Sequence, residues 1–168
     1  PIFEETFNRY DIPEELKDEG LATTIQVDGA NAADFYKECY VSSIYDKAPI
    51  SNEKIELQTN INKKVQTYFL TGENDEIYMM ARVSDTEKNK GITFNADNTA
   101  LAFVTFHPFF ANIDSLAYDV LEEAILNSQN FPKLRTETSN VIRQKQDLYN
   151  EGNTALFDAL DAVLEELL

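Results

Sequence analysis

The chain is poor in the residues from which catalytic and metal sites are most often built. Its 168 residues include one cysteine, one histidine and no tryptophan. With one cysteine no disulfide can form within the chain, and transition-metal sites made of cysteine and histidine lack their usual ligands. Basic residues are also scarce, because 14 lysines and arginines face 30 acidic residues, for a formal net charge of -16. This balance argues against direct binding to the phosphate backbone of nucleic acid.

Long hydrophobic runs are missing as well. No apolar run approaches the roughly 18 residues of a membrane helix. The acidic start of the chain, residues 1–5, lacks the basic and apolar parts of a signal peptide. Hydrophobic residues nevertheless make up 43% of the chain and aromatic residues 11%, which is too much for a disordered acidic tail. We therefore expect a single folded domain over residues 1–168, located in the cytoplasm or incorporated into a virus particle.

The excess of acidic residues is concentrated toward the two ends of the sequence. Residues 1–20 carry seven acidic and two basic residues, and residues 114–168 carry eleven and four. Residues 21–70 are nearly balanced, with six acidic and five basic residues. This distribution predicts that most of the acidity belongs to the solvated faces of helices at the two ends.

The middle of the chain, residues 53–106, has the pattern of a β-sheet. Residues 55–59 alternate apolar and polar side chains, residues 65–70 are β-branched and aromatic, and residues 72–75 suit a hairpin loop. In the next strand we expect Ile77, Met79, Ala81 and Val83 to share one face. Residues 92–94 predict a short strand. Residues 100–106 follow a tight turn at 97–98 and are apolar on both faces, which predicts a central strand.

Helices are expected on both sides of this sheet. The N-terminal part, residues 1–50, predicts a short helix over 13–20, an added strand over 22–27 that ends at an Asp28-Gly29 turn, and a helix over 31–45. The C-terminal part, residues 114–168, predicts a helix from Asp114 to the Phe131-Pro132 pair, a weaker helix over 134–151 and a final helix capped by Asn153 or Thr154. The predicted fold class is α+β: an antiparallel meander of four to five strands flanked by N-terminal helices and three amphipathic C-terminal helices.

The search for catalytic chemistry in the sequence is mostly negative. A Ser-His-Asp or Cys-His mechanism would have to use His107, and neither it nor Cys39 lies in a local motif of an activated nucleophile. The loop over 85–91 resembles a calcium loop but lacks the required glycine and bidentate glutamate. Pairs of adjacent glutamates are typical of the solvent-exposed faces of helices and do not by themselves indicate a catalytic site. We therefore expect a protein that is not an enzyme and that has no catalytic residue, cofactor or metal.

Candidate binding residues come from aromatic and leucine patterns. The group from Phe103 to Phe110 is either a plug between the sheet and the next helix or a patch that docks a partner. The last helix carries a leucine stripe that packs on the sheet or supports self-association. The residues predicted to bind a partner are Tyr68, Tyr78, Phe106, Phe109, Phe110, Leu160, Leu164 and Leu167.

These features favour a non-catalytic acidic protein that binds other proteins. Such a protein would be a chaperone, an assembly factor or an immunity-type inhibitor. It would bind through an apolar face with an acidic rim that attracts a basic partner. The alternative is a structural or accessory component of a virus particle, and homo-oligomerisation stays open. A DNA mimic and an enzyme are less favoured. In composition and element order only, the chain resembles secretion-type chaperones and phage or plasmid accessory proteins, and folds of this kind host many roles.

Overall fold

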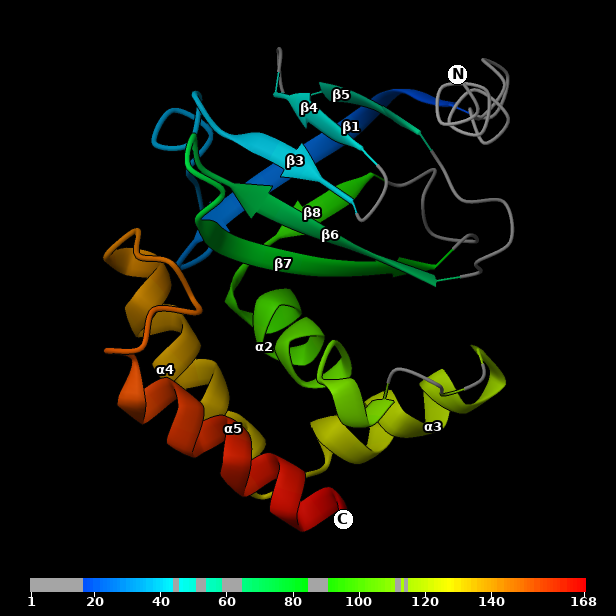
Figure 1. Ribbon diagram of the computed structural model, residues 1–168, viewed down its shortest axis with the longest axis vertical. Helices are drawn as coiled ribbons and strands as arrows, with labels where there is room; N and C mark the ends of the chain where they lie inside the picture. The colour runs from blue at the N-terminus through cyan, green and yellow to red at the C-terminus, as the bar shows by residue number, and fades with distance from the viewer. Residues whose placement is uncertain are drawn as a thin grey trace, which may run out of the picture.

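The structure is a computed structural model of two β-sheets and a layer of helices (Figure 1). It describes residues 17–43, 46–50, 54–58, 65–84, 91–110, 113 and 115–168, with the backbone alone for 17–20, 54–58 and 115–116. The strands are β1 (Lys17–Val27), β2 (Ala30–Asn31), β3 (Tyr40–Ser42), β4 (Lys47–Pro49), β5 (Lys54–Gln58), β6 (Val65–Thr71), β7 (Ile77–Ser84) and β8 (Ile92–Phe94). The helices are α2 (Ala96–Thr105), the short 3-10 helix η3 (Pro108–Phe110), α3 (Ser115–Leu126), α4 (Phe131–Arg143) and α5 (Thr154–Leu167).

The described strands form two sheets of four. One sheet is antiparallel throughout, in the order β4-β3-β6-β7. In the other, β1 pairs antiparallel with β2 and β5 and parallel with β8. The predicted α+β class with an antiparallel sheet and C-terminal helices is confirmed. None of the described helices has both the length and the apolar character needed to cross a membrane.

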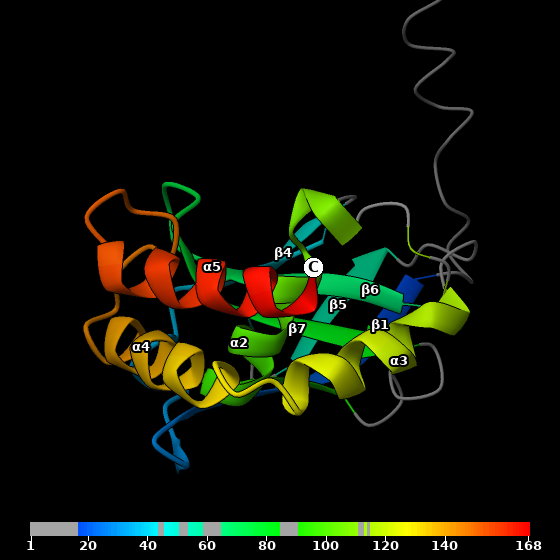
Figure 2. The same cartoon turned by 90° about the horizontal axis from the view of Figure 1, so that it is seen from below.

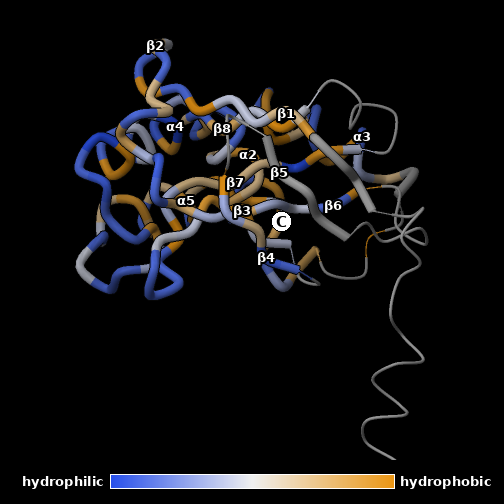
Figure 3. Tube along the Cα trace, turned by 90° about the horizontal axis from the view of Figure 1, so that it is seen from above, coloured by the Kyte–Doolittle hydropathy of each residue, from blue (hydrophilic) through white to orange (hydrophobic). Residues whose placement is uncertain are grey.

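The antiparallel sheet lies between two hydrophobic cores, so that the molecule has three layers (Figures 1 and 2). Tyr68 and Leu70 of β6 point into a core shared with the other sheet, which we call the inter-sheet core. Phe69 and, on β7, Met80 point the other way, into a core made mainly by the helices, the helical core. This alternation is the ordinary consequence of a strand buried on both faces. In Figure 3 the tip of the β1–β2 hairpin stands out as hydrophilic.

A β-bulge changes the predicted face of two residues in β7. Leu70 of β6 pairs with Met79, but the next residue of β6, Thr71, pairs with Ile77, which leaves Tyr78 as the extra residue. Ile77 therefore packs against the helical core and Tyr78 against the inter-sheet core. The prediction that Ile77 shares a face with Met79 is wrong for this reason. Met79, Ala81 and Val83 lie in the inter-sheet core as predicted.

The segment predicted as a central strand over 100–106 is instead most of helix α2. The side chain of Asn95 caps the helix, because its Oδ1 accepts a hydrogen bond of 2.8 Å from the amide of Asn98. The predicted turn at 97–98 is thus the first turn of the helix. Contacts with β7 and with α3, α4 and α5 bury most of α2 from Thr99 to Thr105, so this part of its sequence shows no polar face.

Four further element predictions need correction. The predicted helix over 31–45 is a series of turns over 33–38 followed by β3, whose Val41 pairs with Leu70 of β6. Phe131-Pro132 begins α4 rather than ending the preceding helix, since proline is tolerated in a first helical turn. Helix α4 ends at Arg143, well before residue 151. Residues 17–20 of the predicted helix over 13–20 belong to β1, and the remainder of that helix lies outside the described residues.

Other predicted elements are confirmed. Helix α5 begins directly after Asn153. The turn at Asp28 and Gly29 has φ angles of 51° and 80°. Asp-Gly suits such a hairpin because both of its positions require positive φ. This turn carries the side chain of Asp28 toward α4.

Candidate functional site

Helix α2 is largely buried from Thr99 to Thr105, and surface features with different chemistry lie at its two ends. Its buried residues are Thr99, Ala100, Ala102, Phe103, Val104 and Thr105. The hydroxyl of Thr99 contacts both backbone groups of Met80, accepting from the amide at 3.1 Å and donating to the carbonyl at 3.2 Å. These two bonds fix α2 against β7, so the sheet determines where both ends of the helix lie.

The C-terminal end of α2 carries exposed aromatic rings. Phe106 is 44% exposed and Phe109 is 65% exposed, and we call these two residues with Pro108 the aromatic surface. The ring of Phe106 packs edge-on against Phe69 of β6, with a centroid distance of 5.1 Å. Phe110 is buried in the helical core and anchors η3 there. The aromatic surface is therefore held in place from both of its ends.

Phe109 is also positioned by the single histidine. Its ring stacks on His107 with a centroid distance of 4.8 Å and an interplanar angle of 23°. The amide of Phe109 donates a hydrogen bond of 3.2 Å to Nδ1 of His107, so this ring nitrogen acts as an acceptor. Cys39, the other residue considered for catalysis, lies in the inter-sheet core, where burial raises the pKa of its thiol. Within the described structure His107 thus supports an aromatic side chain, and Cys39 is a core residue.

The structure does not place all predicted binding residues together. Tyr68 and Tyr78 contribute to the inter-sheet core, on the far side of the sheet from Phe69. Leu160 and Leu164 are buried in the helical core, and Leu167 packs against it half-buried. Of the eight predicted residues, Phe106 and Phe109 are the large exposed ones. The aromatic group from Phe103 to Phe110 thus divides into core and surface residues.

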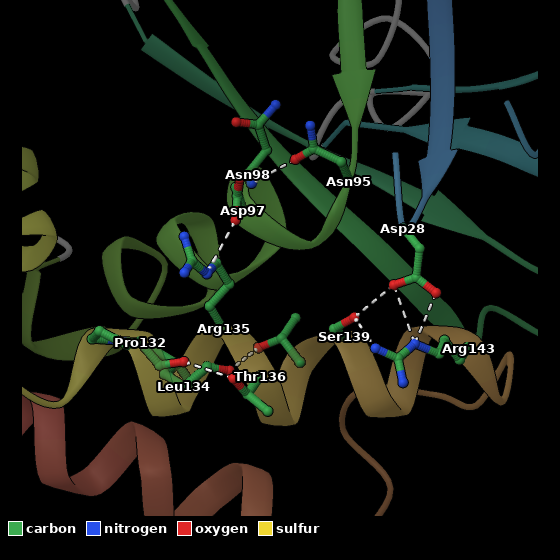
Figure 4. A network of polar contacts seen from close by, with 11 residues as sticks. Asp28, Asn95, Asp97, Asn98, Pro132, Leu134, Arg135, Thr136, Ser139 and Arg143 are labelled. Carbon is green, nitrogen blue, oxygen red and sulfur yellow. Dashed lines mark hydrogen bonds and ion pairs between the residues drawn. The ribbon is translucent and has the colours of Figure 1, made fainter. Parts of the chain in front are cut away.

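The N-terminal end of α2 opens onto a polar groove of about 360 Å³. Three segments that are distant in sequence line it: the β1–β2 turn at Asp28 and Gly29, the start of α2 at Ala96 and Asp97, and one side of α4. Figure 4 shows Arg135 of α4 pointing to Asp97, and Ser139 and Arg143 of the same helix pointing to Asp28. We call this feature the polar groove.

Two ion pairs cross the polar groove. The Nε atom of Arg143 lies 2.9 Å from Oδ2 of Asp28, and Ser139 donates to the same carboxylate at 3.4 Å. The Nε atom of Arg135 lies 3.5 Å from Oδ1 of Asp97. Both arginines are about half exposed, at 51% and 53%. Such solvent-exposed pairs contribute at most about 1 kcal/mol each, so they orient the guanidinium groups without locking them.

Sequence reasoning missed the polar groove because it summed charge over long segments. All four basic residues of the stretch 114–168 lie in α4 or two residues beyond it: Lys133, Arg135, Arg143 and Lys145. Helices α3 and α5 contain acidic residues and no basic ones. The spacing of Arg135, Ser139 and Arg143 by four residues could have revealed a polar, basic face on one helix.

The N-terminal end of α4 is held by a carboxylate from α5. Glu166 accepts hydrogen bonds from the hydroxyl of Ser128 and from the amides of Gln129 and Asn130, the latter two at 2.9 and 3.3 Å. These hydrogen bonds, the one from Ser128 most of all, lower the pKa of Glu166. A negative charge at this position also suits the N-terminus of a helix. Glu166 therefore helps to set the position of α4 and of the groove residues on it.

Comparison with known proteins adds no family assignment. No protein-family model, no curated protein and no solved structure matches the chain. The functional argument consequently rests on the two ends of α2.

Proposed function

We propose that the chain is a non-catalytic protein-binding protein that receives a basic protein partner on its aromatic surface. The observation that carries this proposal is the exposure of Phe106 and Phe109 on a segment anchored by the buried Phe110. Contiguous exposed aromatic side chains are typical of interfaces, and rings held in place lose little conformational freedom on binding. Phenylalanine residues of this kind serve as anchors that fill pockets on the partner.

Charge is the reason for a basic partner. The chain has a net charge of -16, so a second copy of it would be repelled at long range and a basic protein attracted. Helix α3, which follows the aromatic surface along the chain, exposes Asp119 and Glu123 together with Val120. The exposed acidic side chains of α3 add to the negative charge that attracts a basic partner. This arrangement gives the partner both an anchor and electrostatic steering.

Site-specific photo-crosslinking tests the proposal. A benzophenone amino acid replaces Phe109 in one variant and Phe35 in a matched control, because Phe35 is also an exposed phenylalanine, at 52%. Irradiation in cell extract is expected to give an adduct with a basic protein through position 109 and none through position 35. The adduct should disappear when Phe106→Ser is added and should weaken at about 0.5 M salt, where charges are screened within a few ångströms.

Three outcomes would contradict the proposal. One is the absence of an adduct through position 109. Another is recovery of the same adduct through position 35, which would indicate nonspecific capture. The third is a covalent dimer of the chain itself as the main product, which would replace the basic partner with a second copy.

A further inference from the structure

Arg135 keeps most of its hydrogen-bonding capacity, and Arg143 keeps part of it. Arg135 makes its ion pair through Nε at 3.5 Å, and its two terminal amino groups donate to no acceptor among the described residues. Arg143 uses its terminal amino groups in two long contacts, of 3.5 Å to Asn140 and 3.4 Å to Ser139. A guanidinium group offers five N–H donors in a planar fork that matches carboxylate and phosphate oxygens. The groove thus contains two cations with donors to spare.

The first turn of α2 lines the groove opposite the arginines. The first amides of a helix have no acceptor within the helix, and the side chain of Asn95 satisfies that of Asn98. Ala96 and Asp97, which precede Asn98, line the groove. Helix N-termini carry a partial positive charge that favours anions. The arginines of α4 and the N-terminal turn of α2 therefore line one groove.

Asp28 and Asp97 are the carboxylates that pair with the two arginines. Their side chains are 54% and 67% exposed, so a competing anion displaces a weak, hydrated pair rather than a buried one. The volume of about 360 Å³ is larger than one anionic group needs, and Ser139 and Thr136 are among the polar residues that line it. The groove can therefore hold an anionic group together with a polar remainder of the ligand.

We propose that the polar groove is a binding site for a small ligand with an anionic oxygen group, phosphate or carboxylate, held between Arg135, Arg143 and the N-terminus of α2. This site is independent of the aromatic surface, because the two lie at opposite ends of a buried helix. Asp28 and Asp97 orient the arginines and set a modest affinity by competing with the ligand. Removal of an arginine must then weaken ligand binding, whereas removal of one of the two aspartates must strengthen it.

Nuclear magnetic resonance titration of the full chain tests this site. Inorganic phosphate and, in a separate experiment, acetate are added at constant ionic strength, and the amide signals of Gly29, Ala96 and Ser139 are followed. A saturable shift with phosphate alone identifies a phosphate site, and a saturable shift with acetate alone identifies a carboxylate site. Saturable shifts with both anions identify a general anion site. No saturable shift with either anion overturns the proposal.

Three substitutions make the test specific. Arg135→Gln is expected to weaken binding about tenfold, the usual effect of losing a charge-assisted hydrogen bond. Lys133→Gln is the matched control, because it removes the same charge from α4 at a residue that does not line the groove. Asp97→Asn is expected to strengthen binding several-fold by removing the competing carboxylate. Equal weakening by Lys133→Gln, or weakening by Asp97→Asn with the thermal midpoint unchanged, would contradict the proposal.

Discussion

The two ends of helix α2 differ in chemistry. The N-terminal end meets charged and hydroxyl side chains from α4 and the β1–β2 turn, and the C-terminal end continues into exposed phenylalanines. Between them α2 is largely buried against the sheet and helices α3, α4 and α5. One buried element thus positions both a polar groove and an aromatic surface.

This comparison indicates that the two surfaces can be altered separately. A helix of ten residues is about 15 Å long at 1.5 Å per residue. Substitutions separated by more than about 7–10 Å with no shared contacts usually have additive effects. Changes at one end should leave the other end functional, whereas changes in the buried middle should damage both.

The largest expected effect comes from the buried middle of α2. Phe103→Ala is expected to lower the free energy of unfolding by about 3–5 kcal/mol, because Phe103 is 2% exposed and its removal leaves a cavity in the helical core. Phe109→Ala removes a phenylalanine side chain from the exposed end and should change the free energy of unfolding by less than about 0.5 kcal/mol. Urea denaturation of both variants measures the difference. Equal destabilisation would show that Phe109 is a core residue and would remove the basis of the aromatic surface.

A smaller effect is expected at the N-terminal end of the helix. Asn95→Ala removes the side chain that caps α2 and should lower the free energy of unfolding by about 1 kcal/mol. Asn95→Asp keeps an acceptor at the same position and should be close to the original protein in stability. Hydrogen exchange should show faster exchange in the first turn of α2 for the alanine variant. An unchanged exchange rate there would mean that the cap does not order the end that lines the groove.

The smallest effect concerns the position of α4 beside the groove. Because hydrogen bonds lower the pKa of Glu166 in the folded state, the ionised carboxylate stabilises the fold above the usual glutamate pKa. This stabilisation is lost as the pH falls through the lowered folded-state pKa. Glu166→Gln should therefore be slightly less stable than the original protein at neutral pH and equal to it in acid. A stability difference that does not narrow on acidification, measured by urea denaturation, would contradict this role of Glu166.

Secondary structure is predicted well from the sequence where one face of a helix or strand is exposed to solvent. Helix α5 alternates leucines with acidic residues and follows from this periodicity, whereas β6 and β7 are buried on both faces and follow from the hairpin loop between them. Helix α2 is largely buried from Thr99 onward, and its continuous apolar run has no period to distinguish helix from strand. The bulge at Tyr78 depends on pairing with β6 and leaves no local signal.

The candidate sites were predictable to different degrees. The aromatic surface is local in sequence, so Phe106 and Phe109 could be named in advance, although which of the neighbouring aromatics are exposed depends on packing. The polar groove combines segments around residues 28, 96 and 139, and no pattern in the sequence indicates that these three segments lie close together in space. The ion pairs of Arg135 and Arg143 become visible once the fold brings those segments together.

The most direct test of the account uses the partner recovered through position 109. Its affinity is measured for the original protein, Phe109→Ser and Arg135→Gln, each at low and high salt. We expect Phe109→Ser to weaken binding at least tenfold, as loss of an interface anchor does, and Arg135→Gln to leave it unchanged. High salt should weaken binding of the original protein. Equal losses in the two variants, or full affinity in Phe109→Ser, would contradict the assignment of protein binding to the aromatic end of α2.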